Sequence, residues 1–308
     1  MKNTNIFSNR ITQLESTAVS EMLKHISSPN VIPFAAGNPS PEAFPKEIIA
    51  EIATEILNKN PITALQYGKT EGYLPLRESL VDFLGSDFNA DNAILITSGA
   101  TQGIELITKT FTNEGDLVIC ENPTFIGTLN AFRSYNLDVK GIPMESDGIN
   151  IQALENALKE AKEKGKNVRF IYTIPNFQNP SGATLSLQKR ESMYRLALEH
   201  NVLILEDDPY GDLRYFGEHI PSIKSMDTKG IVLYAGSFSN IISPGLRVGY
   251  LVVHERFFEK LTAAKQVSDV HNPLLCQMII HEFMKRHGLD NHIAEIRKIY
   301  KRKLTLTL

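Results

Sequence analysis

Short runs of apolar and β-branched residues alternate along the chain with longer segments in which apolar residues recur every three or four positions. The first pattern is typical of buried strands, and the second is typical of amphipathic helices that cover a sheet. We predict strands at residues 93–97, 116–120, 168–174, 201–205, 231–235 and 247–253, and helices at 101–112, 151–164 and 186–200. This alternation predicts an α/β fold with a mainly parallel central sheet.

The two ends of the chain follow different patterns. Residues 1–40 are interpreted as an N-terminal arm, which runs into the proline-rich loop 39–45. After residue 255 the pattern is helical up to Tyr300, and no capping signal closes the last helix. We therefore expect a large domain at 41–255, followed at 256–308 by the start of a small C-terminal domain that is incomplete.

Composition narrows the range of partners. The chain has 308 residues, which is ample for a sizeable core, and a formal net charge of −3. This near balance of charge gives no reason to expect a nucleic acid or a membrane surface as a partner. No apolar run reaches the length of a membrane span, and the N-terminus lacks the pattern of a signal peptide. A cytoplasmic location is expected.

Cysteine and histidine, the residue types used for disulfides and many metal sites, show no informative spacing. The two cysteines, Cys120 and Cys276, form no CxxC pair. Cys120 ends an apolar run, which favours a buried thiol over a reactive one. The eight histidines show no paired ligand spacing, so no metal site is predicted.

Polar residues follow several of the predicted strands, at the edge where open α/β sheets bind ligands. Ser98, Gly99 and Ala100 lie between the strand at 93–97 and a helix, where free N–H groups favour an anion. A Ser-Gly turn in this place also fits a simple helix cap.

Three consecutive acids, Glu206, Asp207 and Asp208, follow the strand at 201–205. Adjacent carboxylates repel one another unless a cation or a proton compensates their charge. A cationic cofactor ring, a divalent metal or plain solvent would each reduce this repulsion. The metal is disfavoured because no histidine or second acidic cluster has ligand-like spacing.

The most specific motif lies at residues 237–250. It reads Ser-Phe-Ser-Asn-Ile-Ile-Ser-Pro-Gly-Leu-Arg-Val-Gly-Tyr and resembles the segment of class I/II pyridoxal-phosphate (PLP) aminotransferases in which Ser-x-Ser-Lys precedes Pro-Gly-x-Arg-x-Gly. Residues 175–182 resemble the Asn-Pro-(Thr/Ser)-Gly turn of the same family, and residues 66–77 resemble its Tyr-x-x-x-x-Gly-x-x-x-Leu-Arg segment. The chain is therefore similar to fold-type-I PLP enzymes, of the aminoadipate and aromatic transaminase type that is also fused into GntR/MocR regulators.

The resemblance implies a three-layer PLP-transferase fold, pyridoxal 5′-phosphate as cofactor and a homodimer as the working form. The groups that would hold the cofactor phosphate are Ser98, Gly99, Ala100, Ser237, Ser239 and Arg247. Tyr67 would cross the dimer interface to the partner's phosphate. A turn between two helices is the alternative interpretation of Tyr67 and the glycines that follow it.

The same resemblance implies roles around the cofactor ring and the substrate. Phe125 would stack on the ring, and Asp207 would hold its pyridinium proton. Asn179 and Tyr210 would bind the 3′-oxygen. The residues that would face an amino acid or 2-oxo acid substrate are Gly37, Asn38 and Asn176. A core aromatic and a simple loop are the alternatives for Phe125 and Asn179.

Asn240 occupies the position of the family's catalytic lysine. That lysine bonds covalently to the cofactor and later moves a proton, and an asparagine amide does neither. A second departure is that the chain ends at Leu308, before the arginine that would clamp the substrate carboxylate. We expect a PLP-binding protein of the aminotransferase family with impaired turnover.

Two other functions fit the same scaffold. A non-catalytic ligand-sensing or dimerisation module is suggested by family members that are fused to DNA-binding domains. The slightly negative net charge and the short segment before residue 30 argue against such a regulator. A β- or γ-lyase or a decarboxylase needs the same lysine, so Asn240 argues against it equally, and the motif at 175–182 favours transamination.

Overall fold

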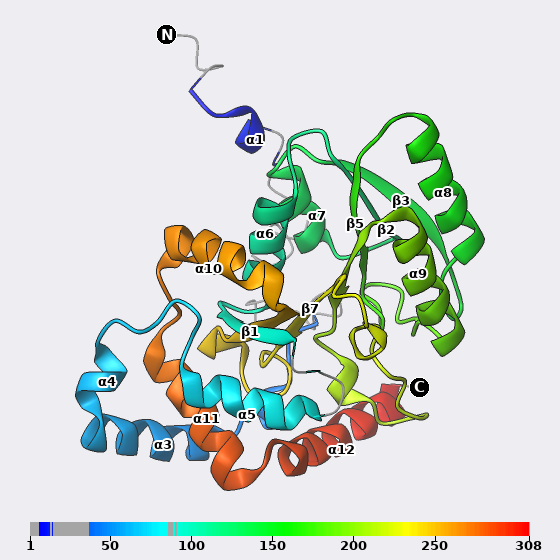
Figure 1. Ribbon diagram of the computed structural model, residues 1–308. Helices are drawn as coiled ribbons and strands as arrows, with labels where there is room; N and C mark the ends of the chain where they lie inside the picture. The colour runs from blue at the N-terminus through cyan, green and yellow to red at the C-terminus, as the bar shows by residue number, and fades with distance from the viewer. Residues whose placement is uncertain (1–5, 13, 15–36, 86–88, 90, 308) are drawn as a thin grey trace.

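The computed structural model describes residues 6–12, 14, 37–85, 89 and 91–307. Within these residues the strands form one eight-stranded sheet in the order β1-β8-β7-β6-β5-β2-β3-β4. The bounds are β1 (Asn92–Thr97), β2 (Leu117–Asn122), β3 (Asp138–Glu145), β4 (Gly148–Ile149), β5 (Val168–Thr173), β6 (Leu203–Asp207), β7 (Val232–Ser237) and β8 (Gly249–His254). Figure 1 shows the sheet inside the molecule with helices on both sides.

The pairing directions place the carboxyl ends of six strands, β1, β2, β3, β5, β6 and β7, at one edge of the sheet. β2 pairs in parallel with β3 and β5, and β6 pairs in parallel with β5 and β7. β8 runs antiparallel to both β7 and β1, so β1 has the same direction as β7. The predicted α/β fold with a mainly parallel sheet is confirmed. The loops that follow β1, β2, β5, β6 and β7 therefore meet at one edge, where such folds bind ligands.

Helices cover both faces of the sheet, which gives the three expected layers. Along β1, Leu95 shares a buried cluster with residues of α6 and α10, whereas its neighbour Ile96 shares another with residues of α5 and α11. This alternation follows from the two-residue repeat of a strand. The helices are α1 (Asn9–Thr12), α3 (Lys46–Lys59), α4 (Pro61–Leu65), α5 (Leu74–Leu84), α6 (Ala100–Phe111), α7 (Ile126–Arg133), α8 (Ile151–Glu163), α9 (Leu187–His200), α10 (Glu255–Asp269), α11 (Leu274–His287) and α12 (Leu289–Thr307).

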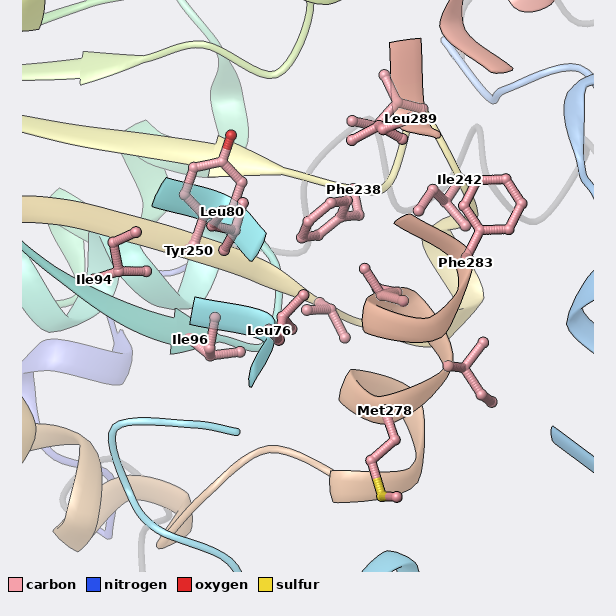
Figure 2. Packing of buried hydrophobic residues seen from close by; sticks show 14 of the residues in the cluster. Leu76, Leu80, Ile94, Ile96, Phe238, Ile242, Tyr250, Met278, Phe283 and Leu289 are labelled. Carbon is pink, nitrogen blue, oxygen red and sulfur yellow. The ribbon is translucent and has the colours of Figure 1, made fainter. Parts of the chain in front are cut away.

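One apolar cluster joins the early and late helices to the β1–β8 half of the sheet. Figure 2 labels Leu76, Leu80, Ile94, Ile96, Phe238, Ile242, Tyr250, Met278, Phe283 and Leu289 among its residues. Burial of a large apolar side chain contributes about 1.5–3 kcal/mol. Phe238 and Ile242 are both almost fully buried there, and they lie two residues before and after Asn240. The cluster therefore anchors the loop that carries Asn240.

Some elements differ from the prediction for local reasons. The sequence pattern does not predict β3, because Ile142 is its one fully buried residue and no apolar run marks the strand. The short β4 and α7 are also missed. The predicted strand starts at Asn201 and Arg247 are wrong, since both residues have a positive φ, 52° and 51°, and belong to turns before β6 and β8.

The two ends of the chain are only partly described. The arm predicted at 1–40 lies mostly outside the described residues, and the domain boundaries at 40 and 255 stay predictions. The helical pattern after residue 255 is confirmed as α10, α11 and α12, although α12 begins at Leu289 rather than near Asn291. None of the helices in the described ranges is long and apolar enough to cross a membrane.

Candidate cofactor site

A cavity of about 180 Å³ lies where the loops after β1, β2, β6 and β7 meet. Nine of the residues that the sequence assigns to a cofactor line it. They are Gly99, Ala100, Phe125, Asp207, Tyr210, Ser237, Ser239, Asn240 and Arg247. These residues are up to 148 positions apart in the chain, and the topology of the sheet brings them together.

Gly99 and Ala100, at the start of α6, line the cavity together with Arg247. Ser98 precedes Gly99 without lining the cavity itself, and we call these four residues the phosphate cup. Gly99 is the N-cap of α6, and as a glycine it has no side chain that could cap the N–H groups of this helix end. Uncapped N–H groups at a helix start attract an anion. The backbone approaches closely here, because a Cβ on Gly99 would lie 2.5 Å from Arg247 Nη2 and one on Gly249 would lie 2.7 Å from the Gly99 carbonyl carbon.

Ser98 is held from its backbone and its side chain. Arg247 Nη2 donates a hydrogen bond to the Ser98 carbonyl oxygen at 2.6 Å. Asn272 Nδ2 donates to Ser98 Oγ at 3.0 Å and to the Arg247 carbonyl oxygen at 3.3 Å. Because Ser98 Oγ accepts this bond, its own hydrogen remains available for a ligand. Asn272 is fully buried, and the sequence analysis missed it.

Two serine hydroxyls face the cup from the end of β7. Ser237 Oγ donates to Ser239 Oγ at 3.0 Å, and the Ser239 backbone N–H donates to Ser237 Oγ at 3.1 Å. Both residues line the cavity together with Arg247. Arginine and hydroxyl donors beside an uncapped helix start form a donor set that suits a phosphate group.

Asp207 also lines the cavity, and its side chain is buried. The Tyr172 hydroxyl donates to Asp207 Oδ2 at 2.8 Å, whereas Oδ1 has no hydrogen-bond partner among the described residues. Burial raises the pKa of Asp207 to about 7, the charge of Asp208 adds to this, and the Tyr172 hydrogen bond opposes it. A buried carboxylate oxygen without a partner is costly unless a ligand donates to it.

The three consecutive acids do not form one cluster. Glu206 accepts hydrogen bonds from the backbone N–H groups of Ile223 and Lys224, at 2.8 and 2.7 Å, on the other face of the sheet. Asp208 accepts from the Gly211 backbone N–H at 2.9 Å. Glu206 and Asp207 are buried and Asp208 is half-buried, which excludes a solvated acidic loop. Within the described part of the chain, no group of three or more His, Cys, Asp or Glu side chains is placed to hold a metal ion.

Tyr210 and Asn179 come together above Asp207. Asn179 Nδ2 lies 3.5 Å from the Tyr210 hydroxyl and is oriented to donate to it. The turn that carries Asn179 is tied to the loop after β2, because Gln178 Nε2 donates to Glu121 Oε2 at 3.0 Å and to the Pro123 carbonyl oxygen at 2.8 Å. This tie positions the turns after β2 and β5 relative to each other.

Asn240 lies between this cavity and a wider one of about 450 Å³. Its Nδ2 donates to the Pro209 carbonyl oxygen at 3.2 Å. The wider cavity also contains Gly37 and Asn38, as the sequence predicts for a substrate side. Its other lining residues are Pro39, Phe177, Tyr210, Leu213, Tyr215, Tyr300, Lys303, Leu304 and Thr307.

Four predicted site residues line neither cavity. Ser98 and Asn179 lie next to residues that do, whereas Tyr67 and Asn176 lie elsewhere. Tyr67 is 81% exposed, and its ring stands edge-on to His271 at 5.7 Å. Asn176 is buried beside a separate polar cavity, where its amide donates to Asp208 Oδ2 at 2.9 Å and accepts from Arg190 and Arg214. The structure therefore does not bring either residue into the cofactor cavity of this chain.

The residues around the cavity fit PLP, the cofactor that the resemblance implies. The cup supplies donors for a phosphate, and the unpartnered Asp207 Oδ1 suits the proton of a pyridinium nitrogen. Tyr210 and Asn179 supply donors for a phenolic oxygen, and Phe125 supplies a flat apolar surface. None of these contacts needs the side chain at position 240.

Comparison with known proteins identifies a family that matches this chain and several similar proteins. The family described as aminotransferase class I and II matches residues 29–306. Aromatic-amino-acid aminotransferase 1 of Thermococcus litoralis is 39% identical over 298 residues, which are 96% of this chain and 72% of that protein. The 2-aminoadipate transaminase of Thermus thermophilus is 38% identical over 94% of this chain and 72% of its own length. The crystal structure of Pyrococcus horikoshii kynurenine aminotransferase superposes with a TM-score of 0.93 at 41% identity, covering 96% of this chain and 74% of that one.

Proposed function

The chain belongs to the class I and II aminotransferase family, whose members depend on PLP, and on that premise we propose that it binds PLP together with an amino acid or a 2-oxo acid but turns over poorly. The observation that carries PLP binding is the buried Asp207 Oδ1, which has no partner among the described residues and lies in the same cavity as the start of α6. When bound, PLP supplies an electron-withdrawing ring that stabilises negative charge beside the transferred amino group.

Different residues of this chain bind different parts of the cofactor. Ser98, Gly99, Ala100, Ser237, Ser239 and Arg247 bind the phosphate. Asp207 keeps the ring nitrogen protonated, because its carboxylate is desolvated and has one oxygen free to accept. Tyr210 and Asn179 bind the phenolic oxygen, and Phe125 covers one face of the ring. Together these contacts orient the cofactor and exclude water from it.

Asn240 is the reason for poor turnover. Its amide has no nucleophilic nitrogen and takes up no proton near neutral pH, so it neither bonds covalently to the cofactor nor moves a proton at the substrate carbon. Loss of a general base alone typically costs about 10²–10⁴-fold in rate. The residues proposed to contact PLP do not include Asn240, so the chain is expected to bind PLP even though it turns over poorly.

The wider cavity indicates the class of substrate. The rings of Phe177, Tyr215 and Tyr300 line it, and Lys303 adds a cation. These groups suit amino acids and 2-oxo acids with an aromatic or a carboxylate-bearing side chain. Gly37 and Asn38 line the same cavity, whereas Asn176 lies beside a separate one. Titration of the PLP-loaded chain with aromatic, dicarboxylic and small aliphatic amino acids tests this, and equally tight binding of the small ones would contradict it.

A homodimer is the proposed working form. Ile62, Leu65 and Tyr67 are 81%, 73% and 81% exposed on one short segment. Exposed apolar side chains gathered in this way favour a protein interface. In such a dimer Tyr67 would reach the phosphate cup of the partner subunit, which explains why it lies outside the cavity of its own chain.

Saturable PLP binding is the test of the proposed function. The purified chain is titrated with PLP by difference absorbance, and one site per chain is expected. A titration that shows no saturation would contradict PLP binding. Asn240 also favours a second candidate, a non-catalytic ligand-sensing or dimerisation module. If PLP-loaded chain binds an amino acid and changes its oligomeric state without any turnover, that second candidate replaces slow catalysis.

A further inference from the structure

An ion pair with a fully buried lysine and a half-buried aspartate lies behind the phosphate cup, in a region that the proposed function does not use. Lys265 of α10 is fully buried, and its Nζ lies 2.9 and 3.0 Å from the two carboxylate oxygens of Asp269, one helical turn further along. Lys265 Nζ also donates to Gln102 Oε1 at 3.1 Å. A buried lysine that is removed from solvent needs such partners, because an unpaired charge there is costly.

Gln102 of α6 connects this ion pair to the cup. Its Nε2 donates to Asp269 Oδ2 at 2.6 Å, and its Oε1 accepts both from Lys265 and from the Ser98 backbone N–H at 2.7 Å. The cation thus lies on the oxygen side of the amide and the anion on the nitrogen side. This arrangement fixes the orientation of the amide, since the reversed orientation would point Nε2 at two donors.

Ser98 connects Gln102 to the groups that would bind the phosphate. Its N–H is held by Gln102, its carbonyl oxygen by Arg247 at 2.6 Å and its hydroxyl by Asn272 at 3.0 Å. The Arg247 guanidinium is therefore placed by a residue whose own backbone depends on Gln102. Loss of either charge behind Gln102 would let the amide turn and the Ser98–Arg247 pair move.

We propose that Lys265 and Asp269 are positioning residues of the phosphate cup, which orient the Gln102 amide and thereby hold Ser98 and Arg247 in the arrangement that binds the PLP phosphate. The inference rests on the proposed PLP binding and adds to it two residues that touch no ligand. This positioning role differs from a general packing role of α10 against α6, because loss of either residue should weaken binding of the PLP phosphate and leave binding of the ring unchanged.

Phosphate-bearing and phosphate-free ligands separate these two roles. Wild type, Lys265→Met and Asp269→Asn are titrated with PLP and with pyridoxal, which has the same ring and no phosphate. We expect each substitution to weaken PLP binding about tenfold, or about 1.4 kcal/mol, and to change pyridoxal binding by less than about twofold. Equal losses for both ligands, or an unchanged PLP affinity, would overturn the proposal. If Lys265→Met does not fold, Asp269→Asn decides, because it is isosteric and its side chain is 28% exposed.

Lys224→Met is the matched control. Lys224 is also buried and paired, with Asp227 at 3.3 Å, but it binds the carbonyl oxygen of Val232 at the amino end of β7. That place is about 16 Å along β7 from Ser237, the residue of this strand that lines the cofactor cavity. The control should lower thermal stability and leave the ratio of the PLP and pyridoxal affinities unchanged. A control that lowers this ratio as much as Lys265→Met would show a global effect and overturn the proposal.

Titration with inorganic phosphate distinguishes failure of the inference from failure of the proposed function. A wild-type chain that binds phosphate but not PLP contradicts the proposed function, and the phosphate affinities of the variants then test the inference by the same tenfold criterion. Binding of neither ligand to wild type overturns both. PLP binding with no difference between wild type and the two variants overturns the inference alone.

Discussion

The hydroxyl of Tyr172 donates a hydrogen bond to one carboxylate oxygen of Asp207 at 2.8 Å, and the other oxygen of Asp207 has no partner among the described residues. Both side chains are buried, Tyr172 on β5 and Asp207 at the end of the neighbouring strand β6. Tyr172 thus fixes the orientation of the carboxylate and leaves the second oxygen for a ligand. The pair forms a preorganised acceptor for a cationic ring. Without a ligand, burial of the carboxylate with one oxygen unsatisfied costs free energy of folding, and this cost has measurable consequences.

The first consequence is a pH-dependent stability difference. Burial raises the pKa of Asp207 from its ordinary value of 3.8 to about 7. The folded ligand-free chain therefore holds this proton more tightly than the unfolded chain, and the stability gained is complete below the unfolded pKa and lost as pH rises through the folded pKa. Asp207→Asn has no such proton. We expect the melting temperature of wild type minus that of Asp207→Asn to fall between about pH 5 and about pH 8.

Other buried carboxylates, such as Glu206, are present in both proteins and cancel in this comparison. A difference in melting temperature that stays constant or rises with pH would contradict a raised pKa for Asp207. At about pH 8, Asp207→Asn should also lose most PLP affinity, because a neutral amide does not stabilise the pyridinium charge.

The second prediction concerns the arginine of the cup. Replacing Arg247 with Met removes a charge-assisted hydrogen-bond donor worth about 1.5–3 kcal/mol, so PLP affinity should fall about 10–100-fold. Arg256→Met is a suitable control, since Arg256 also donates to a backbone carbonyl, that of Gly230, at 2.8 Å but does not line the cavity. Equal PLP affinities of the two variants would exclude Arg247 as a phosphate ligand.

A third prediction tests the close backbone approach at Gly99. Gly99 and Gly115 both have a positive φ, of 78° and 80°, and a Cβ meets Arg247 only at Gly99. Each Gly→Ala substitution should lower the free energy of unfolding by about 1–3 kcal/mol because of backbone strain. PLP affinity, measured by titration, should fall for Gly99→Ala and stay near the wild-type value for Gly115→Ala. The cup is wrongly assigned if the two variants bind PLP equally.

The fourth prediction addresses the dimer. Leu65→Glu places a charge on the exposed segment that includes Tyr67, and it should shift the chain from dimer to monomer in sedimentation velocity. PLP affinity should fall with it, because each cup would lose the Tyr67 of its partner. Leu187→Glu, on α9 and 43% exposed, should leave both properties unchanged. A wild-type chain that sediments as a monomer would contradict the proposed interface.

The strands and the carboxyl-edge residues were predictable because each leaves a local signal. The apolar runs that become β1, β2 and β5–β8 are short and continuous, as expected of strands buried on both faces. The run of three acids at a strand end marks the place, and the resemblance to the aminotransferase family selects Asp207 among them. The alternation of a strand also explains why Glu206 points to the opposite face. β3 escapes detection because seven of its eight residues are at least partly exposed.

The supporting residues leave no local signal. Tyr172 lies within an apolar run, and its contact with Asp207 depends on the register in which β5 pairs with β6. Asn272 and Lys265 reach the cup from 174 and 163 positions away, so their roles follow only from the packing of α10 and α11. A lysine and an aspartate four positions apart on an otherwise amphipathic helix are ordinary surface features, and burial alone distinguishes Lys265 and Asp269 from them.

The most direct test of the account is whether the chain forms a covalent link with PLP. Wild type and Asn240→Lys are loaded with PLP, freed of excess cofactor, reduced with borohydride and compared by intact mass and peptide mapping. The account predicts one pyridoxyl group at position 240 in Asn240→Lys and none in wild type, with a gain in turnover of at least about 10²-fold. A reduced adduct in the wild-type chain, for example at Lys303 in the adjoining cavity, would contradict it, as would an Asn240→Lys variant that carries none.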